Sequence, residues 1–140
     1  MIRIDTSTEF GARVRHRLDN DLIVWLVTTD GKGTPQPSPV WFLPHGESIL
    51  VYSRPNTAKL RNIERNPRVA LHFDGDDHGG NIVIMTGTAV IDRTMPSALE
   101  FPAYLAKYAD GIQRLSMTSQ SFAAAYSVPI LVEPLTLRGF

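Results

Sequence analysis

Residues 52–71 read YSRPNTAKLRNIERNPRVAL, and this stretch decides how the chain is expected to fold. Asn56 or Thr57 can cap a helix, and the proline near the end of the stretch should stop it, because a residue before proline disfavours the helical region. Leu60 and Ile63 would share its buried face. The apolar run SILVYS precedes this helix and VALHFD follows it, so the stretch predicts a short helix between two strands.

Three further segments have the character of strands. Residues 22–27 are β-branched, aromatic or leucine, and the Asp30-Gly31 pair after them is typical of a hairpin turn. PQPSPVWFLPHGES, residues 35–48, would return as the partner strand, with prolines that confine it to a sheet edge. NIVIMTGTAVID, residues 81–92, predicts a long strand that bends at Gly87.

Helices are predicted at the two ends of this β-rich region. Apolar residues at helical spacing occupy positions 10–18, after a possible serine or threonine cap among residues 6–8. A second helical stripe covers residues 98–112, and a shorter one covers residues 122–126. The chain then closes on a strand with the sequence VPILVEPLTLRGF.

These elements together describe a mainly β (α+β) fold. Strands in hairpin order with one intervening helix are typical of a small antiparallel barrel of six strands with flanking helices. A parallel doubly wound sheet is excluded because helices do not alternate with the strands. Since no linker or repeat interrupts the sequence, we expect residues 1–140 to form one domain.

Composition narrows the possible partners. The 14 basic and 14 acidic side chains balance, which argues against a nucleic-acid binder, so any anion site must be local. The absence of cysteine excludes disulfides and thiolate metal sites, and it fits a reducing cytoplasm. Neither a membrane-spanning apolar run nor a signal-peptide core is visible, so we expect a cytoplasmic protein with no membrane partner.

A local anion site is indicated at the start of the helix in the opening stretch. The free N–H groups of its first turn, the hydroxyls of Ser53 and Thr57, and the cations Arg54 and Lys59 would together hold a phosphate. A cation in the first turn is otherwise unfavourable for the helix dipole. The alternative is a solvated basic helix face, with Glu64 as an internal partner.

The proline-rich segment indicates a second feature. Its prolines leave the remaining amides and carbonyls of an edge strand free, and a planar heterocycle could be recognised by those groups. The alternative is an edge strand that its prolines protect from aggregation. Trp41 and Phe42 point to opposite faces, so one should be core and the other should border a pocket or a subunit interface.

The sequence gives no support for a metal site, a catalytic nucleophile or a dinucleotide-binding motif. DGDDHGG, residues 74–80, fails the calcium-loop pattern and is interpreted as a solvated turn. The four histidines lack metal-ligand spacing, and no nucleophile motif or dinucleotide fingerprint is present, so we predict neither a metal site nor a catalytic side chain.

From Trp25 to Ile91 the sequence resembles the pyridoxamine 5′-phosphate oxidase-like split β-barrel superfamily. The motifs that carry the resemblance are PQPSPVWF and, further on, YSxPNTxKxRNIxxNPRVAL. The most similar branch is that of the actinobacterial oxidoreductases that depend on the deazaflavin coenzyme F420. The resemblance implies a split β-barrel of the FMN-binding type.

It also implies a homodimer with two cofactor sites in grooves between the subunits. The flavin or deazaflavin ring would lie along the second strand, at Gln36, Pro37, Ser38, Pro39, Val40 and Trp41. The cofactor phosphate would be held by Ser53, Arg54, Asn56, Thr57, Lys59, Arg61 and Asn62. Tyr126 and Arg138 would complete the site from the other subunit.

The function implied is an F420-dependent oxidoreductase that transfers hydride from the reduced deazaflavin to a small organic acceptor. The cofactor would then carry the chemistry, and no protein nucleophile is needed. Two alternatives share the fold: an FMN-dependent oxidase or reductase, and a protein that only binds flavin, deazaflavin or haem.

Overall fold

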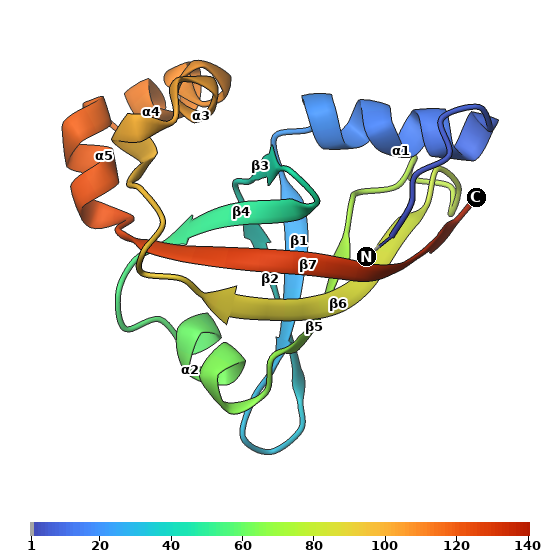
Figure 1. Ribbon diagram of the computed structural model, residues 1–140, viewed down its shortest axis with the longest axis horizontal. Coiled ribbons are helices and arrows are strands. Elements are labelled where there is room, and N and C mark those ends of the chain that lie inside the picture. The colour runs from blue at the N-terminus through green and yellow to red at the C-terminus, as the bar shows by residue number, and fades with distance from the viewer. Residues whose placement is uncertain (1) are drawn as a thin grey trace.

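A computed structural model describes residues 2–140 (Figure 1). In chain order its helices and strands are α1 Glu9–Asn20, β1 Val24–Thr29, β2 Pro35–Val40, β3 Leu43–His45, β4 Ser48–Ser53, α2 Ala58–Arg65, β5 Arg68–His72, β6 Val83–Ile91, η1 Ala98–Glu100, α3 Pro102–Lys107, α4 Ala109–Arg114, α5 Ser119–Ala125 and β7 Val128–Gly139.

The strands form one curled antiparallel sheet in the order β2-β1-β5-β6-β7-β4-β3. The predicted split-barrel fold is therefore confirmed, and the proline-rich β2 lies at an edge as expected. Helix α2 joins β4 to β5 beneath the sheet in the view of Figure 1. No helix within residues 2–140 has the length and apolar character needed to cross a membrane.

The strand count differs from the prediction, with seven strands in place of six. Residues 35–48 do not form one strand, because β2 pairs with β1 at one edge of the sheet and β3 pairs with β4 at the other. The break falls at Phe42, whose backbone N–H donates to the hydroxyl of Tyr108 at 2.8 Å. This bond to a distant side chain replaces a bond of the sheet, so the chain leaves the edge there.

The predicted bend of the long strand is confirmed at Gly87. The pairing of β6 with β7 shifts between Thr86 and Gly87, where Gly87 lies opposite Pro134. A Cβ at Gly87 would lie 1.9 Å from the carbonyl oxygen of Glu133, so only glycine allows the two backbones to approach this closely. Pro134, which has no N–H to donate, therefore lies at the bulge, where β7 pairs with β6 alone.

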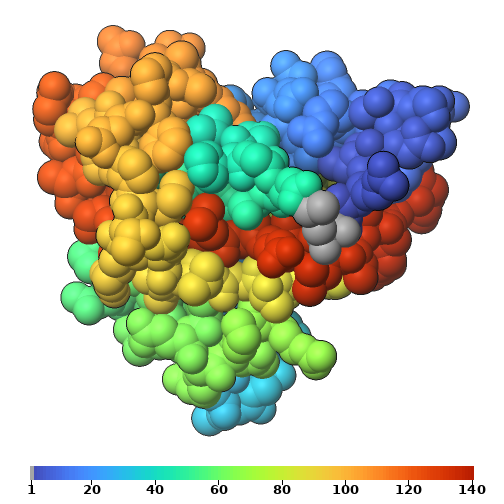
Figure 2. Space-filling model, viewed as in Figure 1, coloured from blue at the N-terminus to red at the C-terminus, as the bar shows by residue number. Residues whose placement is uncertain are grey.

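The helices enclose two separate cores. Helix α1 begins at its Thr8 cap, as predicted, and with α2 it closes the core inside the sheet. The predicted helix over residues 98–112 is divided into η1, α3 and α4. These helices and α5 cover a second, aromatic core around Tyr104. Figure 2 shows them as a lobe separated from α1 by the β3–β4 hairpin.

Candidate functional site

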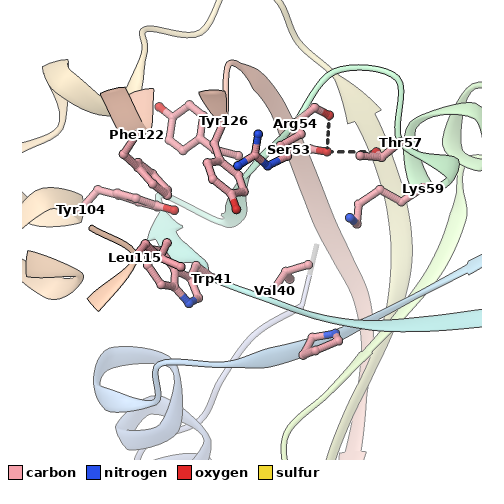
Figure 3. A pocket seen from close by; sticks show the side chains of 12 residues that line it. Val40, Trp41, Ser53, Arg54, Thr57, Lys59, Tyr104, Leu115, Phe122 and Tyr126 are labelled. Carbon is pink, nitrogen blue, oxygen red and sulfur yellow. Dashed lines mark hydrogen bonds between the residues drawn. The ribbon is translucent and has the colours of Figure 1, made fainter. Parts of the chain in front are cut away.

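A pocket of about 390 Å³ lies where the end of β2 and the end of β4 meet the C-terminal helical lobe (Figure 3). Its walls come from β2, β4, α2 and residues 104–126. The lining residues are Pro39, Val40, Trp41, Tyr52, Ser53, Arg54, Thr57, Lys59, Tyr104, Leu115, Phe122 and Tyr126. Figure 3 shows an aromatic end on one side and the Ser53, Thr57 and Lys59 end on the other.

The polar end is built on the turn that leads into α2. The Ser53 hydroxyl donates to the carbonyl of Arg54 at 2.8 Å, and its oxygen lies 3.1 Å from the hydroxyl oxygen of Thr57. Thr57 is the N-cap residue by position, but its side chain accepts no capping hydrogen bond. The first-turn N–H groups of α2 are therefore left without a side-chain acceptor, which suits them to an anion.

Two cations line the pocket, Lys59 at this end and Arg54 next to Tyr126 of the aromatic end. Lys59 is partly buried, and burial lowers its pKa below the ordinary lysine value. The Arg54 guanidinium lies 4.7 Å from the centre of the Tyr126 ring. Within residues 2–140 neither cation has a carboxylate at ion-pair distance. Two uncompensated cations beside free amides give the pocket a local positive potential, although the whole chain is neutral.

The aromatic end is a series of stacked rings. Trp41 lies 4.5 Å from Tyr108 with the ring planes nearly parallel, and 5.3 Å from Phe122. Phe122 in turn stacks on Tyr126 at 4.6 Å. Phe42, the neighbour of Trp41, is fully buried in the other core, so the predicted division of the two residues between core and pocket is confirmed.

Helix α4 fixes the position of the Trp41 ring. A Cβ at Gly111 would lie 2.8 Å from two carbons of the Trp41 benzo ring, closer than real Cβ contacts allow. The ring cannot move away easily, because Tyr108 and Phe122 stack against it. A glycine at this point of the helix therefore permits the ring to form the pocket wall.

We expect Gly111→Ala to displace Trp41. Overpacking costs roughly 1–3 kcal/mol, and the better helix propensity of alanine returns up to about 1 kcal/mol, so the free energy of unfolding should fall by about 1 kcal/mol. Chemical denaturation measures that loss, and near-ultraviolet circular dichroism should report the altered tryptophan environment. An unchanged spectrum would contradict the close contact.

The remaining predicted residues lie around or beside this pocket. A second hollow of about 430 Å³ adjoins it through Lys59, and Gln36, Pro37, Ser38 and Asn62 line that hollow. The buried Asn62 amide donates to the Thr28 hydroxyl at 3.0 Å, a bond that fastens α2 to β1.

Three predicted residues line neither hollow. Arg61 and Asn56 are exposed, and the Arg61 guanidinium donates to the Asn56 carbonyl at 2.8 Å. Arg138 pairs with Ile84 far along β7, whereas Tyr126 lines the pocket of its own chain.

Sequence reasoning missed four lining residues: Tyr52, Tyr104, Leu115 and Phe122. The sequence places Phe122 only on a helix face, because its helical spacing is that of ordinary core packing. The unusual density of aromatic residues between positions 101 and 126 was the available signal. In the part of the chain that the structure describes, no three histidine or carboxylate side chains gather as metal ligands would.

A family model described as pyridoxamine 5′-phosphate oxidase matches residues 10–128. A solved F420 reductase is 25% identical, with a TM-score of 0.62, over 89% of this chain and 94% of its own. None of the curated proteins matches the sequence.

Two other solved structures show the shared fold alone. A conserved hypothetical protein from Mycobacterium tuberculosis has 20% identity and a TM-score of 0.72, over 94% of this chain and 82% of its own. The haem storage protein of Vibrio cholerae has 16% identity and a TM-score of 0.63, over 99% of this chain and 95% of its own.

Proposed function

We propose that this chain, which belongs to the pyridoxamine 5′-phosphate oxidase family, is an F420-dependent oxidoreductase that reduces a small organic acceptor. The observation that carries the proposal is the two-ended pocket, with the unpaired Lys59 at its polar end, stacked aromatic rings at the other end and the unpaired Arg54 against the Tyr126 ring. The similarity to an F420 reductase over nearly the whole of both chains supports the choice of cofactor.

The polar end fits the phosphate of such a cofactor. Lys59 and Arg54 would supply charge, and Ser53, Thr57 and the first-turn amides of α2 would donate hydrogen bonds. No carboxylate in the described chain competes for either cation. Asn56, Arg61 and Asn62 remain candidates, although the side chain of Asn62 already bonds to Thr28.

The ring would lie along β2, beside residues 36–41. Pro35, Pro37 and Pro39 alternate along this edge strand with the residues whose N–H groups can bond to β1, so its outward side offers carbonyl oxygens, and no N–H, to a heterocycle. Reduced F420, when bound, supplies the hydride. The side chains of the pocket would hold the acceptor against the ring and exclude water, which agrees with the prediction that no protein nucleophile takes part.

Two other functions suit the same pocket. FMN also carries a phosphate and a planar ring, so an FMN-dependent oxidase or reductase is the first alternative. The second alternative is a protein that binds the cofactor without catalysing a reaction. A haem storage protein has the same fold.

A cofactor titration tests the proposal. Purified protein should bind F420 and leave FMN largely free, as measured by fluorescence and equilibrium dialysis. Oxidation of reduced F420 should then be followed against a panel of acceptors. Tight retention of FMN without a response to F420 would overturn the cofactor choice, and micromolar F420 binding with complete inertness would favour a binding protein.

We also propose that two chains form a homodimer and that each cofactor groove includes residues of the partner. The pocket opens beside an exposed edge strand, where a second chain could close it. Analytical ultracentrifugation with and without F420 measures the assembly. A monomer that binds F420 with full affinity would contradict this part of the proposal.

The pH dependence of F420 binding should reveal whether the charge of Lys59 contributes to affinity. Because burial lowers the pKa of Lys59, its ammonium loses its proton at a lower pH than the ammonium of an exposed lysine, whose pKa is 10.5. We expect F420 affinity to fall as pH rises toward that value. Lys59→Arg keeps its charge, so the ratio of wild-type to variant Kd should rise as the pH increases toward 10.5, the ordinary lysine value. A constant ratio would exclude titration of Lys59 as the cause.

A further inference from the structure

The hydroxyl of Tyr104 is a buried polar group without a partner. Tyr104 is 0% exposed, and within residues 2–140 its hydroxyl oxygen has no hydrogen bond. The two tyrosines packed against it differ: the Tyr52 hydroxyl donates to the Pro96 carbonyl at 2.6 Å, and the Tyr108 hydroxyl bonds to backbone groups of residues 22 and 42. Since buried polar atoms are nearly always satisfied, this exception requires an explanation.

The position of Tyr104 in the pocket explains why its hydroxyl has no partner in the protein. It lines the aromatic end of the pocket, and Figure 3 shows its ring entering from the helical lobe with the hydroxyl oxygen directed inward, near Trp41 and Leu115. The rings around it are apolar in character, with Phe122 at 6.1 Å. A buried, unpaired hydroxyl among aromatic faces is the kind of group that orients a flat ligand in a mostly apolar pocket.

We propose that the Tyr104 hydroxyl donates a hydrogen bond to a carbonyl oxygen or ring nitrogen of a flat ligand that binds against Trp41 and Phe122. This inference rests on the proposed function, because it assigns the aromatic end of the pocket to the acceptor substrate. The acceptor is then a planar molecule with a hydrogen-bond-accepting atom at one edge. Tyr104 positions it and takes no part in group transfer.

The electrostatics of the site suit a donor. Burial raises the pKa of Tyr104 far above its ordinary value, and the neighbouring tyrosines act in the same direction. The hydroxyl therefore keeps its proton across the working range of pH. A protonated phenol can donate to a ligand oxygen or nitrogen, and its own hydrogen otherwise has no acceptor in the site.

Because the Tyr104 hydroxyl is fully buried, a ligand can reach it only when a lining side chain moves, and we expect Leu115 to be that side chain. Its side chain lines the pocket beside Tyr104 and is 48% exposed, so turning aside costs little buried apolar area. The next residue, Ser116, has a φ of 58° and forms the turn after α4. We expect Leu115→Ala to bind flat ligands at least as tightly as the wild type.

Two matched probes test the hydrogen bond in the full chain without cofactor. 1-Indanone and indane have almost the same shape, but only 1-indanone carries a carbonyl oxygen. Their Kd values are measured by ligand-detected NMR titration in wild type, Tyr104→Phe and Tyr52→Phe. Tyr104→Phe should weaken 1-indanone binding by about three- to tenfold, the range for one neutral hydrogen bond, and leave indane unchanged. Tyr52→Phe should change neither Kd, because that hydroxyl already bonds to Pro96.

Three results would contradict the hydrogen bond proposed for Tyr104. Equal Kd shifts for both probes in Tyr104→Phe, no shift for either, or no 1-indanone binding by the wild type would each overturn the inference. F420 titration of the same proteins is read separately. If the wild type does not bind F420, but Tyr104→Phe still weakens the binding of 1-indanone and not that of indane, the proposed function is refuted and the inference about Tyr104 is upheld.

Discussion

Lys59→Ala is expected to weaken F420 binding by about 1.5–3 kcal/mol, or about 10- to 150-fold in Kd. The ammonium lies at the polar end of the pocket, partly buried and without a carboxylate partner in the described chain. A phosphate bound there would form a charge-assisted hydrogen bond in surroundings that water screens only partly. Alanine removes that bond, and isothermal titration calorimetry measures the loss.

The fold should survive this substitution. Holding an uncompensated lysine partly out of water is unfavourable without the ligand, so the free energy of unfolding of the apo protein should not fall. Arg65→Ala is the matched control, since Arg65 is an exposed cation on the same helix that lines neither hollow. Its F420 affinity should stay within about twofold of the wild type. Equal losses in both variants would indicate a general charge effect and remove Lys59 from the site.

The polar half of the site could be predicted from the sequence because its determinants are local. Ser53, Thr57 and Lys59 lie within a few residues of one helix start, and cap and breaker signals locate that start. The bend at Gly87 is local in the same sense, since a glycine within a strand pattern marks a bulge or close backbone contact.

The aromatic half could not be predicted because it depends on distant contacts. Trp41 stacks on Tyr108 and Phe122, from which strands β3 to β6 separate it along the chain. Apolar residues at helical spacing look the same whether they face a core or a pocket. The missed break between β2 and β3 has the same origin. It is fixed by the Tyr108 hydroxyl, 66 positions away from Phe42.

Tyr108→Phe should therefore affect both stability and the shape of the site. The hydroxyl accepts from the Phe42 N–H at 2.8 Å and donates to the Leu22 carbonyl at 2.8 Å or to the Phe42 carbonyl at 3.0 Å. Phenylalanine keeps the ring but leaves a buried N–H without an acceptor. We expect the free energy of unfolding to fall by about 1–3 kcal/mol, measured by urea denaturation.

Tyr104→Phe is the control that isolates this hydroxyl, because both rings belong to the same aromatic core and only the Tyr108 hydroxyl has partners. Removing an unsatisfied hydroxyl should leave stability within about 0.5 kcal/mol of the wild type or raise it. In Tyr108→Phe the segment from β2 to β3 loses its anchor next to Trp41, so F420 affinity should fall together with stability. Equal destabilisation by the two substitutions would mean that the rings, and not the bond to Phe42, hold this edge of the pocket in place.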